Sequence, residues 1–307
     1  MTPGSCCRAA VPEMARAIIA ECAPAAEVVA IDDLQDLGEV DFIVPVPRTS
    51  AELANRLSGL DRLAVVQTLS AGVDAFSSGV PDHVTLCSAR GARDAPVAEW
   101  VLGALLGAST GLLHYARRTS WNRDQTLADL GEWTVLIVGM GSIGAHLARL
   151  LRALGTTVTG VASRARDGVH GVGELDRLLG EADAVVVLAA LSEATHGLIG
   201  APQLAAMHDG AVLVNAARGP VVDTDALVAE TGTGRLRAVL DVTDPEPLPD
   251  GHPLWRAPGV LAISPHIAGD SPRGARQAIE LAGDQLARWC AGEPLVNVVH
   301  LGKERSS

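Results

Sequence analysis

The 307-residue sequence contains a single lysine, Lys303, and a single tyrosine, Tyr115. Schiff-base enzymes need a lysine amine in the active site, and a P-loop needs a lysine beside its bound phosphates. Because Lys303 lies in a polar C-terminal segment, neither class fits this chain. Thr119 stands four residues after Tyr115, where a Tyr-x-x-x-Lys catalytic pair would have its lysine, so that chemistry is excluded as well.

Positive charge and long apolar runs are also scarce. The net charge of −12 argues against nucleic acid or an anionic membrane as the main partner. The longest apolar run, from Trp100 to Leu113, is broken by small and polar residues and is shorter than the roughly 20 residues of a membrane span. The first eight residues lack the pattern of a secretory signal. We therefore expect no membrane partner and a cytoplasmic protein.

The cysteines are odd in number, and none of them shows the paired spacing that is typical of a metal site. We therefore expect reduced thiols and no bound metal, in keeping with a cytoplasmic setting. The five cysteines are Cys6, Cys7, Cys22, Cys87 and Cys290.

The most informative stretch runs from Thr134 to Ala145. Four apolar residues lead into Gly-x-Gly-x-x-Gly and a helical pattern follows, which predicts a strand, a tight turn and a helix. Glycine-rich turns also occur for structural reasons, but in this context the first glycine permits the bend, the second lets the backbone approach a pyrophosphate, and the third lets the helix pack closely. The helix start would hold the pyrophosphate. The predicted cofactor-binding residues of this turn are Gly139, Gly141, Ser142, Ile143 and Gly144.

Short apolar runs alternate with helical patterns on both sides of this turn. With 48% hydrophobic and 20% charged residues the chain is globular, and its length suits two domains of about 150 residues each. The alternation predicts parallel sheets covered by helices. Predicted strands span 6–11, 27–31, 41–46, 63–69, 84–87, 134–138, 157–161, 184–189, 211–215, 237–242, 260–264 and 295–301, and predicted helices span 15–22, 50–57, 97–117, 173–179, 202–207, 224–229 and 273–290.

One predicted helix stands apart by its composition. Asp94-Ala95-Pro96 indicates a helix start, with Asp94 as the cap and proline in the first turn. The helix that follows, 97–117, is apolar nearly all round. We expect it to be buried on most sides, between domains or between subunits.

Three polar residues stand at the ends of predicted strands, where ligands of open α/β sheets bind. Arg218 closes one strand segment, Glu246 follows the next, and His266 follows the last. Arginine suits a carboxylate, histidine exchanges a proton near neutral pH, and an adjacent carboxylate would orient the histidine. Taken singly, each residue also fits a structural or solvated role. Their occurrence at successive strand ends favours a catalytic site.

With these residues in place, the chain resembles the D-2-hydroxyacid dehydrogenases, the family of D-lactate and phosphoglycerate dehydrogenases and glyoxylate/hydroxypyruvate reductases. The resemblance covers about residues 69–279 and is specific because the order and spacing of several motifs agree. Besides the glycine turn, these motifs are Ser70-Ala71-Gly72-Val73-Asp74, Pro96-Val97-Ala98-Glu99, residues 191–200, Asn215-Ala216-Ala217-Arg218-Gly219, Leu240-Asp241-Val242, Glu246-Pro247-Leu248-Pro249 and Pro265-His266-Ile267-Ala268-Gly269.

The resemblance implies a role for each catalytic residue. Arg218 would bind the substrate carboxylate and polarise the neighbouring carbonyl, and His266 would donate a proton as hydride arrives from the nicotinamide. Glu246 would hydrogen-bond the imidazole and keep it protonated. Backbone N–H groups of Ala71 and Gly72 would hold the substrate carboxylate from the other domain.

The resemblance also implies the fold and the assembly. We expect an α/β chain of two Rossmann-like doubly wound domains, in which an NAD(P)-binding domain of residues 97–274 is inserted into a discontinuous, flavodoxin-like substrate domain of residues 1–96 and 275–307. The cleft would close by a hinge, and a homodimer would form through the 97–117 helix. Ala217 and Asp241 would join the cofactor site, with Asp241 at the nicotinamide carboxamide.

The segment after the second nucleotide-domain strand departs from the family pattern. Many members have an aspartate there that binds the ribose hydroxyls, and this chain has Ala162, followed by Ser163, Arg164 and Arg166. A hydroxyl and arginines can hold a ribose phosphate. We predict that NADP(H) is preferred, while NAD(H) remains the alternative if both arginines are ordinary solvated residues.

The expected function is hydride transfer between NAD(P)H and a small 2-keto acid such as glyoxylate or hydroxypyruvate. One alternative is a non-catalytic, NAD(P)-sensing protein of the corepressor type. A second is a dehydrogenase of an unrelated alcohol, for which Arg218 would be dispensable. The intact arginine, glutamate and histidine favour the 2-keto acid reductase.

Overall fold

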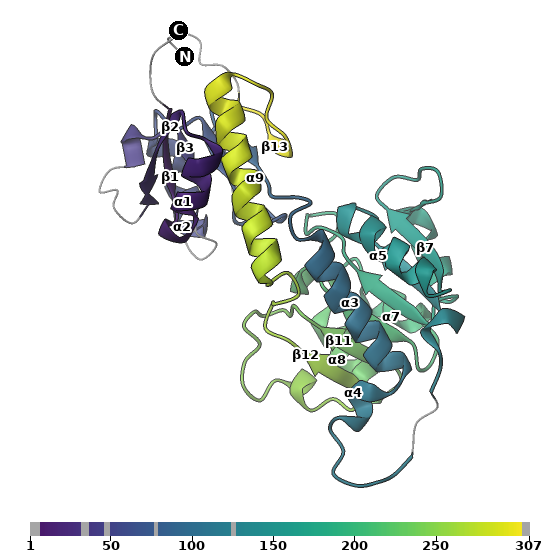
Figure 1. Ribbon diagram of the computed structural model, residues 1–307. Helices are drawn as coiled ribbons and strands as arrows, with labels where there is room; N and C mark the ends of the chain where they lie inside the picture. The colour runs from purple at the N-terminus through teal and green to yellow at the C-terminus, as the bar shows by residue number, and fades with distance from the viewer. Residues whose placement is uncertain (1–6, 32–36, 46–49, 77–78, 124–126, 303–307) are drawn as a thin grey trace. The chain divides into compact units, whose positions relative to one another are not determined.

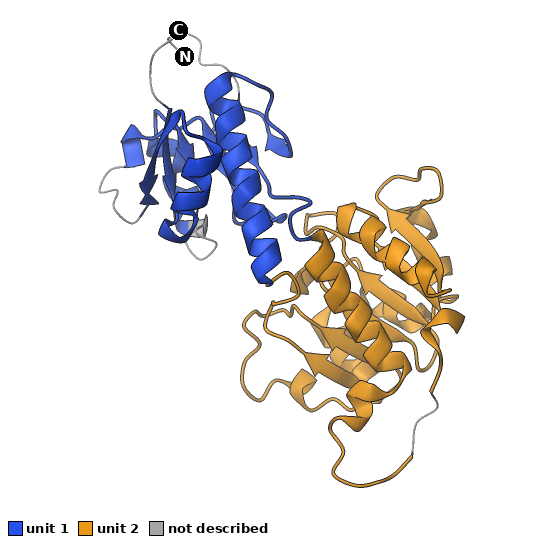
Figure 2. Ribbon diagram, in the orientation of Figure 1, with its two compact units in different colours: residues 1–93, 271–307 blue, residues 94–270 orange. Residues whose placement is uncertain are grey.

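The structure is a computed structural model that describes residues 7–31, 37–45, 50–76, 79–123 and 127–302. The chain divides into two compact units, and each is described here by itself (Figure 2). Unit 1 comprises Met1–Arg93 and Ser271–Ser307, and unit 2 comprises Asp94–Asp270. The two domain starts expected from the sequence, residues 97 and 275, lie three and four residues downstream of these bounds.

Unit 1 contains a six-stranded sheet in the order β13-β5-β4-β3-β1-β2. The first five strands along the chain are parallel, in the flavodoxin-like order 2-1-3-4-5, and β13 is antiparallel to β5. The strands are β1 (Cys7–Val11), β2 (Ala26–Ala30), β3 (Phe42–Ile43), β4 (Val65–Gln67), β5 (Thr85–Cys87) and β13 (Val298–His300).

Helices cover both faces of this sheet because successive strand residues point to opposite sides. Ala9 and Val11 of β1 belong to a core with α1 and α9, while Ala10 between them belongs to a second core with α2. The long α9, which follows unit 2 in the chain, packs along α1 at the start of the chain and completes unit 1 (Figure 1). The helices are α1 (Glu13–Cys22), α2 (Ser50–Arg56) and α9 (Pro272–Ala291).

Unit 2 contains a seven-stranded sheet in the order β12-β11-β10-β9-β6-β7-β8, with all its strands parallel. The strand order reverses between β6 and β9, so the glycine turn after β6 lies at the switch point of a doubly wound sheet, where ligands of this architecture bind. The strands are β6 (Thr134–Val138), β7 (Thr157–Ala162), β8 (His170–Gly171), β9 (Ala184–Val187), β10 (Val212–Asn215), β11 (Arg237–Leu240) and β12 (Val260–Ile263). The sequence analysis missed the two-residue β8.

Both faces of the unit 2 sheet are buried. Along β6, Val135 and Ile137 contribute to one core, and Leu136 and Val138 contribute to the other. The continuous apolar runs of these strands follow from this double burial. The helices are α3 (Asp94–Ser109), α4 (Leu112–Tyr115), α5 (Ser142–Ala153), α6 (Leu175–Leu179), α7 (Ala201–Ala206) and α8 (Thr224–Gly232).

The single helix predicted over 97–117 is wrong, because the chain forms two helices there. Gly111 between α3 and α4 has φ 71°, and a Cβ at this position would lie 2.6 Å from Leu127 Cδ2. A residue in the left-handed region ends a helix, and glycine is the residue that adopts it without penalty. On α3 itself most residues are buried, while Glu99, Gly103 and Leu106 are exposed.

Within the described ranges no helix is long and apolar enough to cross a membrane. The same ranges contain no cluster of three or more His, Cys, Asp or Glu side chains that could hold a metal ion.

Candidate active site at the strand ends of unit 2

Three neighbouring strands of unit 2 end at the predicted catalytic residues. Strands β10, β11 and β12 are adjacent and parallel, and their last residues are in register, Asn215 with Leu240 and Leu240 with Ile263. Arg218 follows β10, Glu246 follows β11 and His266 follows β12. The sheet therefore brings the segments that carry these three residues to one edge.

Glu246 and His266 are in direct contact. Glu246 Oε1 lies 2.6 Å from His266 Nδ1, and the two side chains are 41% and 45% exposed. The contact leaves Nε2, on the other side of the ring, for a second partner. With the carboxylate on Nδ1, the imidazole is oriented and can pass a proton through Nε2.

The loop that carries Arg218 is fixed by the end of its own strand. The Asn215 amide donates to the Arg218 carbonyl over 3.1 Å, and its Oδ1 accepts from Ala217 N over 3.1 Å. The half-buried Arg218 side chain donates from Nη1 to the Ala217 carbonyl over 2.6 Å. Asn215 is 1% exposed, so this loop is anchored from inside the protein. Ala217, predicted to contact the cofactor, is itself buried.

A close backbone approach joins the Arg218 loop to the Glu246 loop. A Cβ on Gly219 would lie 1.9 Å from the carbonyl oxygen of Thr243, so only glycine fits. Two hydroxyls hold the Glu246 loop: Thr243 Oγ1 donates to the Pro245 carbonyl and Thr224 Oγ1 to the Asp244 carbonyl, each over 2.9 Å. The sequence analysis did not identify these threonines, because an isolated threonine carries no spacing signal.

The glycine turn has the three features that a dinucleotide site requires. Gly139 has φ 112°, and a Cβ there would lie 2.4 Å from Ala189 N. A Cβ on Gly144 would lie 2.5 Å from the Gly139 carbonyl oxygen, so this glycine permits tight packing. A Cβ on Gly141 would meet nothing within 4 Å, which leaves open space beside the backbone. The turn has room for a phosphate group where the sequence predicts one.

The start of α5 has backbone donors that suit such a phosphate. Gly141 is its N-cap and has no side-chain capping bond. In the part of the chain that the structure describes, no acceptor receives the N–H groups of Ser142, Ile143 or Gly144. Unpaired N–H groups at a helix start bind anions.

The structure adds Asp94 to this region. Ser142 Oγ donates to Asp94 Oδ1 over 3.0 Å, which links the first residue of α5 to the first residue of α3. The sequence predicted Asp94 only as a helix cap. A contact over 48 residues of chain depends on how α3 and α5 pack, so no local pattern could reveal it.

The predicted ribose-side residues lie after β7. Ser163, Arg164 and Arg166 are exposed. Arg166 N donates a hydrogen bond to the Val169 carbonyl over 3.0 Å, and Val169 N donates one to the Arg166 carbonyl over 2.9 Å. The segment therefore folds into a tight turn. The Arg166 guanidinium donates to the Met140 carbonyl of the glycine turn. Arg166 is thus held across the glycine turn, and within the described ranges no partner of the Arg164 guanidinium is found.

Ala71 and Gly72 belong to unit 1 and follow β4. The Ser70 hydroxyl donates to the Gly72 carbonyl over 2.6 Å, and Ala89 N donates to the Ser70 carbonyl over 2.9 Å, so the loop has a defined course. Among the described residues, none accepts the N–H groups of Ala71 or Gly72. Both groups remain able to bind an anion.

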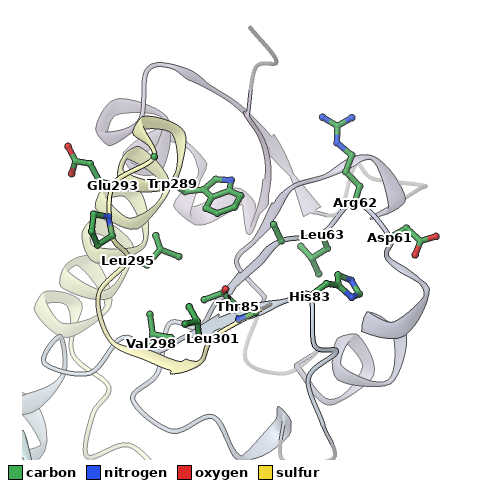
Figure 3. A pocket seen from close by; sticks show the side chains of 14 residues that line it. Asp61, Arg62, Leu63, His83, Thr85, Trp289, Glu293, Leu295, Val298 and Leu301 are labelled. Atoms are coloured by element: carbon green, nitrogen blue, oxygen red, sulfur yellow. Dashed lines mark hydrogen bonds between the residues drawn. The ribbon is translucent and has the colours of Figure 1, made fainter. Parts of the chain in front are cut away.

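Unit 1 also contains a cavity of about 710 Å³ that includes none of the predicted site residues (Figure 3). Leu63, Leu295, Val298 and Leu301 form apolar walls. Because Leu63 precedes β4, the cavity lies at the opposite end of that strand from Ala71 and Gly72.

Comparisons with known proteins identify the family of this chain. Residues 103–268 match the family model described as D-isomer specific 2-hydroxyacid dehydrogenase, NAD binding domain. The chain is 34% identical over 260 residues to glyoxylate/hydroxypyruvate reductase B of Klebsiella pneumoniae (strain 342), which covers 80% of both chains.

Solved structures of similar proteins share the fold. The D-isomer specific 2-hydroxyacid dehydrogenase of Xanthobacter autotrophicus Py2, in complex with NADPH and MES, has a TM-score of 0.81 and 29% identity, and the match covers 96% of this chain and 98% of that one. The NADPH-dependent glyoxylate/hydroxypyruvate reductase of Sinorhizobium meliloti, in complex with NADP and sulfate, has a TM-score of 0.82 and 29% identity, with 97% and 100% covered. These matches confirm the predicted two-domain fold class. The chain belongs to the D-isomer specific 2-hydroxyacid dehydrogenase family.

Proposed function

We propose that this chain is an NAD(P)H-dependent reductase of small 2-keto acids, with glyoxylate and hydroxypyruvate as the first candidates, and that it prefers NADPH. The observation that carries the proposal is the arrangement of Arg218, Glu246 and His266 on adjacent strand ends, with His266 in contact with Glu246. The Klebsiella and Sinorhizobium relatives, whose names state this activity, support the choice of substrate.

Arg218 binds the substrate carboxylate. Its guanidinium presents donors in a fixed fork that matches a carboxylate, and one of its nitrogens is already oriented by the Ala217 carbonyl. Its positive charge also polarises the neighbouring keto group. The backbone N–H groups of Ala71 and Gly72 in unit 1 are uncharged donors for the substrate carboxylate.

His266 transfers the proton. Its Nδ1 is occupied by Glu246, so Nε2 is the nitrogen that donates to the carbonyl oxygen during reduction and accepts the proton in the reverse direction. The Glu246 carboxylate stabilises the positive charge that the imidazole carries before it donates.

The residues of the glycine turn fit a nicotinamide dinucleotide. The open space at Gly141 and the unpaired N–H groups at the start of α5 would hold the pyrophosphate. When bound, the nicotinamide supplies the hydride that reduces the keto carbon. Ser163 and Arg164 would hold a ribose phosphate, and Arg166, fixed on the turn, adds positive charge.

Two features support NADPH over NADH. The segment after β7 has Ala162 where an acidic residue would repel a phosphate, and two exposed arginines follow. In addition, the Xanthobacter and Sinorhizobium structures contain NADPH and NADP.

An NADPH-oxidation assay over a panel of 2-keto acids tests the activity. Arg218→Ala and His266→Ala should each lower kcat/KM by at least about 100-fold while the circular dichroism spectrum stays that of the wild type. Full activity of Arg218→Ala would point to an unrelated alcohol as the substrate. A wild type that reduces no 2-keto acid but captures a protein partner when NADPH is added would support the corepressor alternative.

The ratio of kcat/KM for NADPH and NADH tests the cofactor preference. Replacing Arg164 with alanine should lower kcat/KM for NADPH by about 10- to 100-fold, because a charge-assisted hydrogen bond to phosphate is lost, and leave the value for NADH nearly unchanged. Arg149→Ala, which removes an exposed arginine from α5, is the matched control. A wild-type advantage for NADH would overturn the proposed preference.

The proposal includes a homodimer formed through α3. Gly103 and Leu106, which are exposed on a helix whose residues are mostly buried, provide a small, apolar contact surface. Light scattering at micromolar concentration should give twice the mass of 31.7 kDa, and a monomer would contradict this part of the proposal.

A further inference from the structure

The segment that carries His266 has an unusual backbone. His266 has φ 55°, in the left-handed region that side-chain-bearing residues rarely adopt. The flanking residues Pro265 and Ile267 are exposed, so burial of their side chains does not hold this geometry. A specific restraint is needed to keep the proton-transferring imidazole beside Glu246.

The Asp241 carboxylate provides that restraint. Its Oδ1 accepts from Ser264 Oγ over 2.6 Å and from Ile267 N over 2.8 Å, and its Oδ2 accepts from Ala268 N over 2.9 Å. The three donors lie before and after His266 in the chain. Asp241 is 2% exposed, so these bonds form in a site shielded from water, where they are stronger than at the surface.

The backbone of Asp241 binds the same segment. His266 N donates to the Asp241 carbonyl over 2.8 Å, and Ser264 N donates to the Leu240 carbonyl over 2.8 Å. The end of β11 thus binds the segment 264–268 at its start, at its centre and at its end. Since Asp241 N in turn donates to the Asn215 carbonyl over 2.9 Å, the same strand ends also connect to the loop that carries Arg218.

We propose that Asp241 and Ser264 are positioning residues that hold the left-handed backbone of His266 and so keep its imidazole on Glu246. The Asp241 carboxylate acts through the loop that carries His266. The Ser264 hydroxyl makes the shortest hydrogen bond to this carboxylate and keeps the carboxylate oriented. The expected effect on kcat rests on the proposed function. The expected effect on the position of the His266 imidazole rests on the contacts alone. This positioning role differs from the role expected for Asp241 from the family, a contact with the nicotinamide carboxamide, because that role does not involve Ser264.

Three substitutions test the restraint by kinetics. Ser264→Ala removes one donor, and we expect kcat for 2-keto acid reduction to fall about tenfold while KM for NADPH changes less than about twofold. Ser264→Thr keeps the hydroxyl and should retain kcat. Asp241→Asn replaces acceptor capacity with an N–H₂ group that faces backbone donors, so kcat should fall further, by about 100-fold.

An imidazole NMR spectrum of the cofactor-free protein makes the test independent of turnover. Nitrogen shifts of His266, assigned by comparison with His266→Ala, report its hydrogen bond to Glu246. The spectrum of Ser264→Ala should move toward that of Glu246→Gln, in which the charged acceptor is absent, and that of Ser264→Thr should match the wild type. Wild-type His266 shifts and wild-type kcat in Ser264→Ala would overturn the inference, whereas absence of wild-type turnover with the expected shifts would overturn only the proposed function.

Discussion

Glu246 Oε1 lies 2.6 Å from His266 Nδ1, at the ends of two neighbouring strands. Because a carboxylate stabilises the charged imidazole and an amide does not, Glu246→Gln should lower kcat/KM for keto acid reduction by about 100-fold. Initial rates over a range of pH measure the effect. Asp244→Asn removes an exposed carboxylate from the same loop. Its kcat/KM should stay within about twofold of the wild-type value, because water and salt screen an exposed charge. Equal losses in the two variants would show that His266 does not depend on its contact with Glu246.

Substitutions at two glycines of the turn should affect cofactor binding and folding separately. At Gly141 the backbone is extended with φ −80°, and a Cβ meets nothing within 4 Å, so Gly141→Ala should change the free energy of unfolding by less than about 1 kcal/mol. The methyl group would instead occupy the space of the pyrophosphate, and the dissociation constant for NADPH should rise at least about tenfold. Urea unfolding and fluorescence titration measure the two effects.

Gly144 provides the opposite case. A Cβ there would lie 2.5 Å from the Gly139 carbonyl oxygen, so α5 must move away from β6 to accommodate Gly144→Ala. We expect a loss of about 1–3 kcal/mol in the free energy of unfolding. A Gly144→Ala variant as stable as the wild type, or a Gly141→Ala variant with unchanged affinity for NADPH, would contradict the assigned roles.

Asp94 places a negative charge beside the helix start that we propose for the pyrophosphate. Asp94→Asn keeps an oxygen acceptor for the Ser142 hydroxyl but removes the charge that repels the phosphates. Because two charges a few ångströms apart near a protein surface interact by about 1 kcal/mol or more, KM for NADPH should fall about fivefold at low salt. The gain should shrink as salt screens the charges. Glu99→Gln, about one turn further along α3, is the control, and an equal gain there would indicate a general charge effect.

Much of the site could be predicted from the sequence because its residues occur in ordered motifs. The glycine turn and the strand ends at Arg218, Glu246 and His266 each have a local pattern, and the sheet order determines that the strand ends are neighbours. The restraint of His266 by Asp241 could not be predicted, because it depends on hydrogen bonds between loops. The same holds for the Asp94 contact with Ser142.

The break between α3 and α4 shows another limit of sequence patterns. The apolar pattern continues through Gly111, and a glycine inside a helical pattern is only a weak signal for a break. What ends the helix is the left-handed backbone of Gly111 and the close approach of Leu127. That approach is a tertiary contact, so hydrophobic periodicity could not indicate it.

His114 in α4 should make the stability of the protein depend on pH. Burial lowers the pKa of His114 from its usual 6.5, and the charges of Arg118, Arg117 and Arg237 lower it further. The neutral ring accepts from Arg118 Nη2 over 3.1 Å, and a protonated ring cannot. Because the folded-state pKa is below the unfolded-state value, the unfolded chain binds the proton more readily. The contribution of His114 to stability is therefore complete above about pH 6.5 and is lost as the pH falls below that value toward the folded-state pKa.

Urea unfolding at intervals between pH 5 and pH 8 measures this contribution. In His114→Gln the side chain still accepts a hydrogen bond but does not titrate, so its free energy of unfolding should fall less between pH 7.5 and pH 5 than that of the wild type. Arg118→Gln removes one of the nearby positive charges and should reduce the same slope in part. If the wild type and His114→Gln lose stability in parallel over this range, the pH dependence arises elsewhere in the protein and the assignment to His114 is wrong.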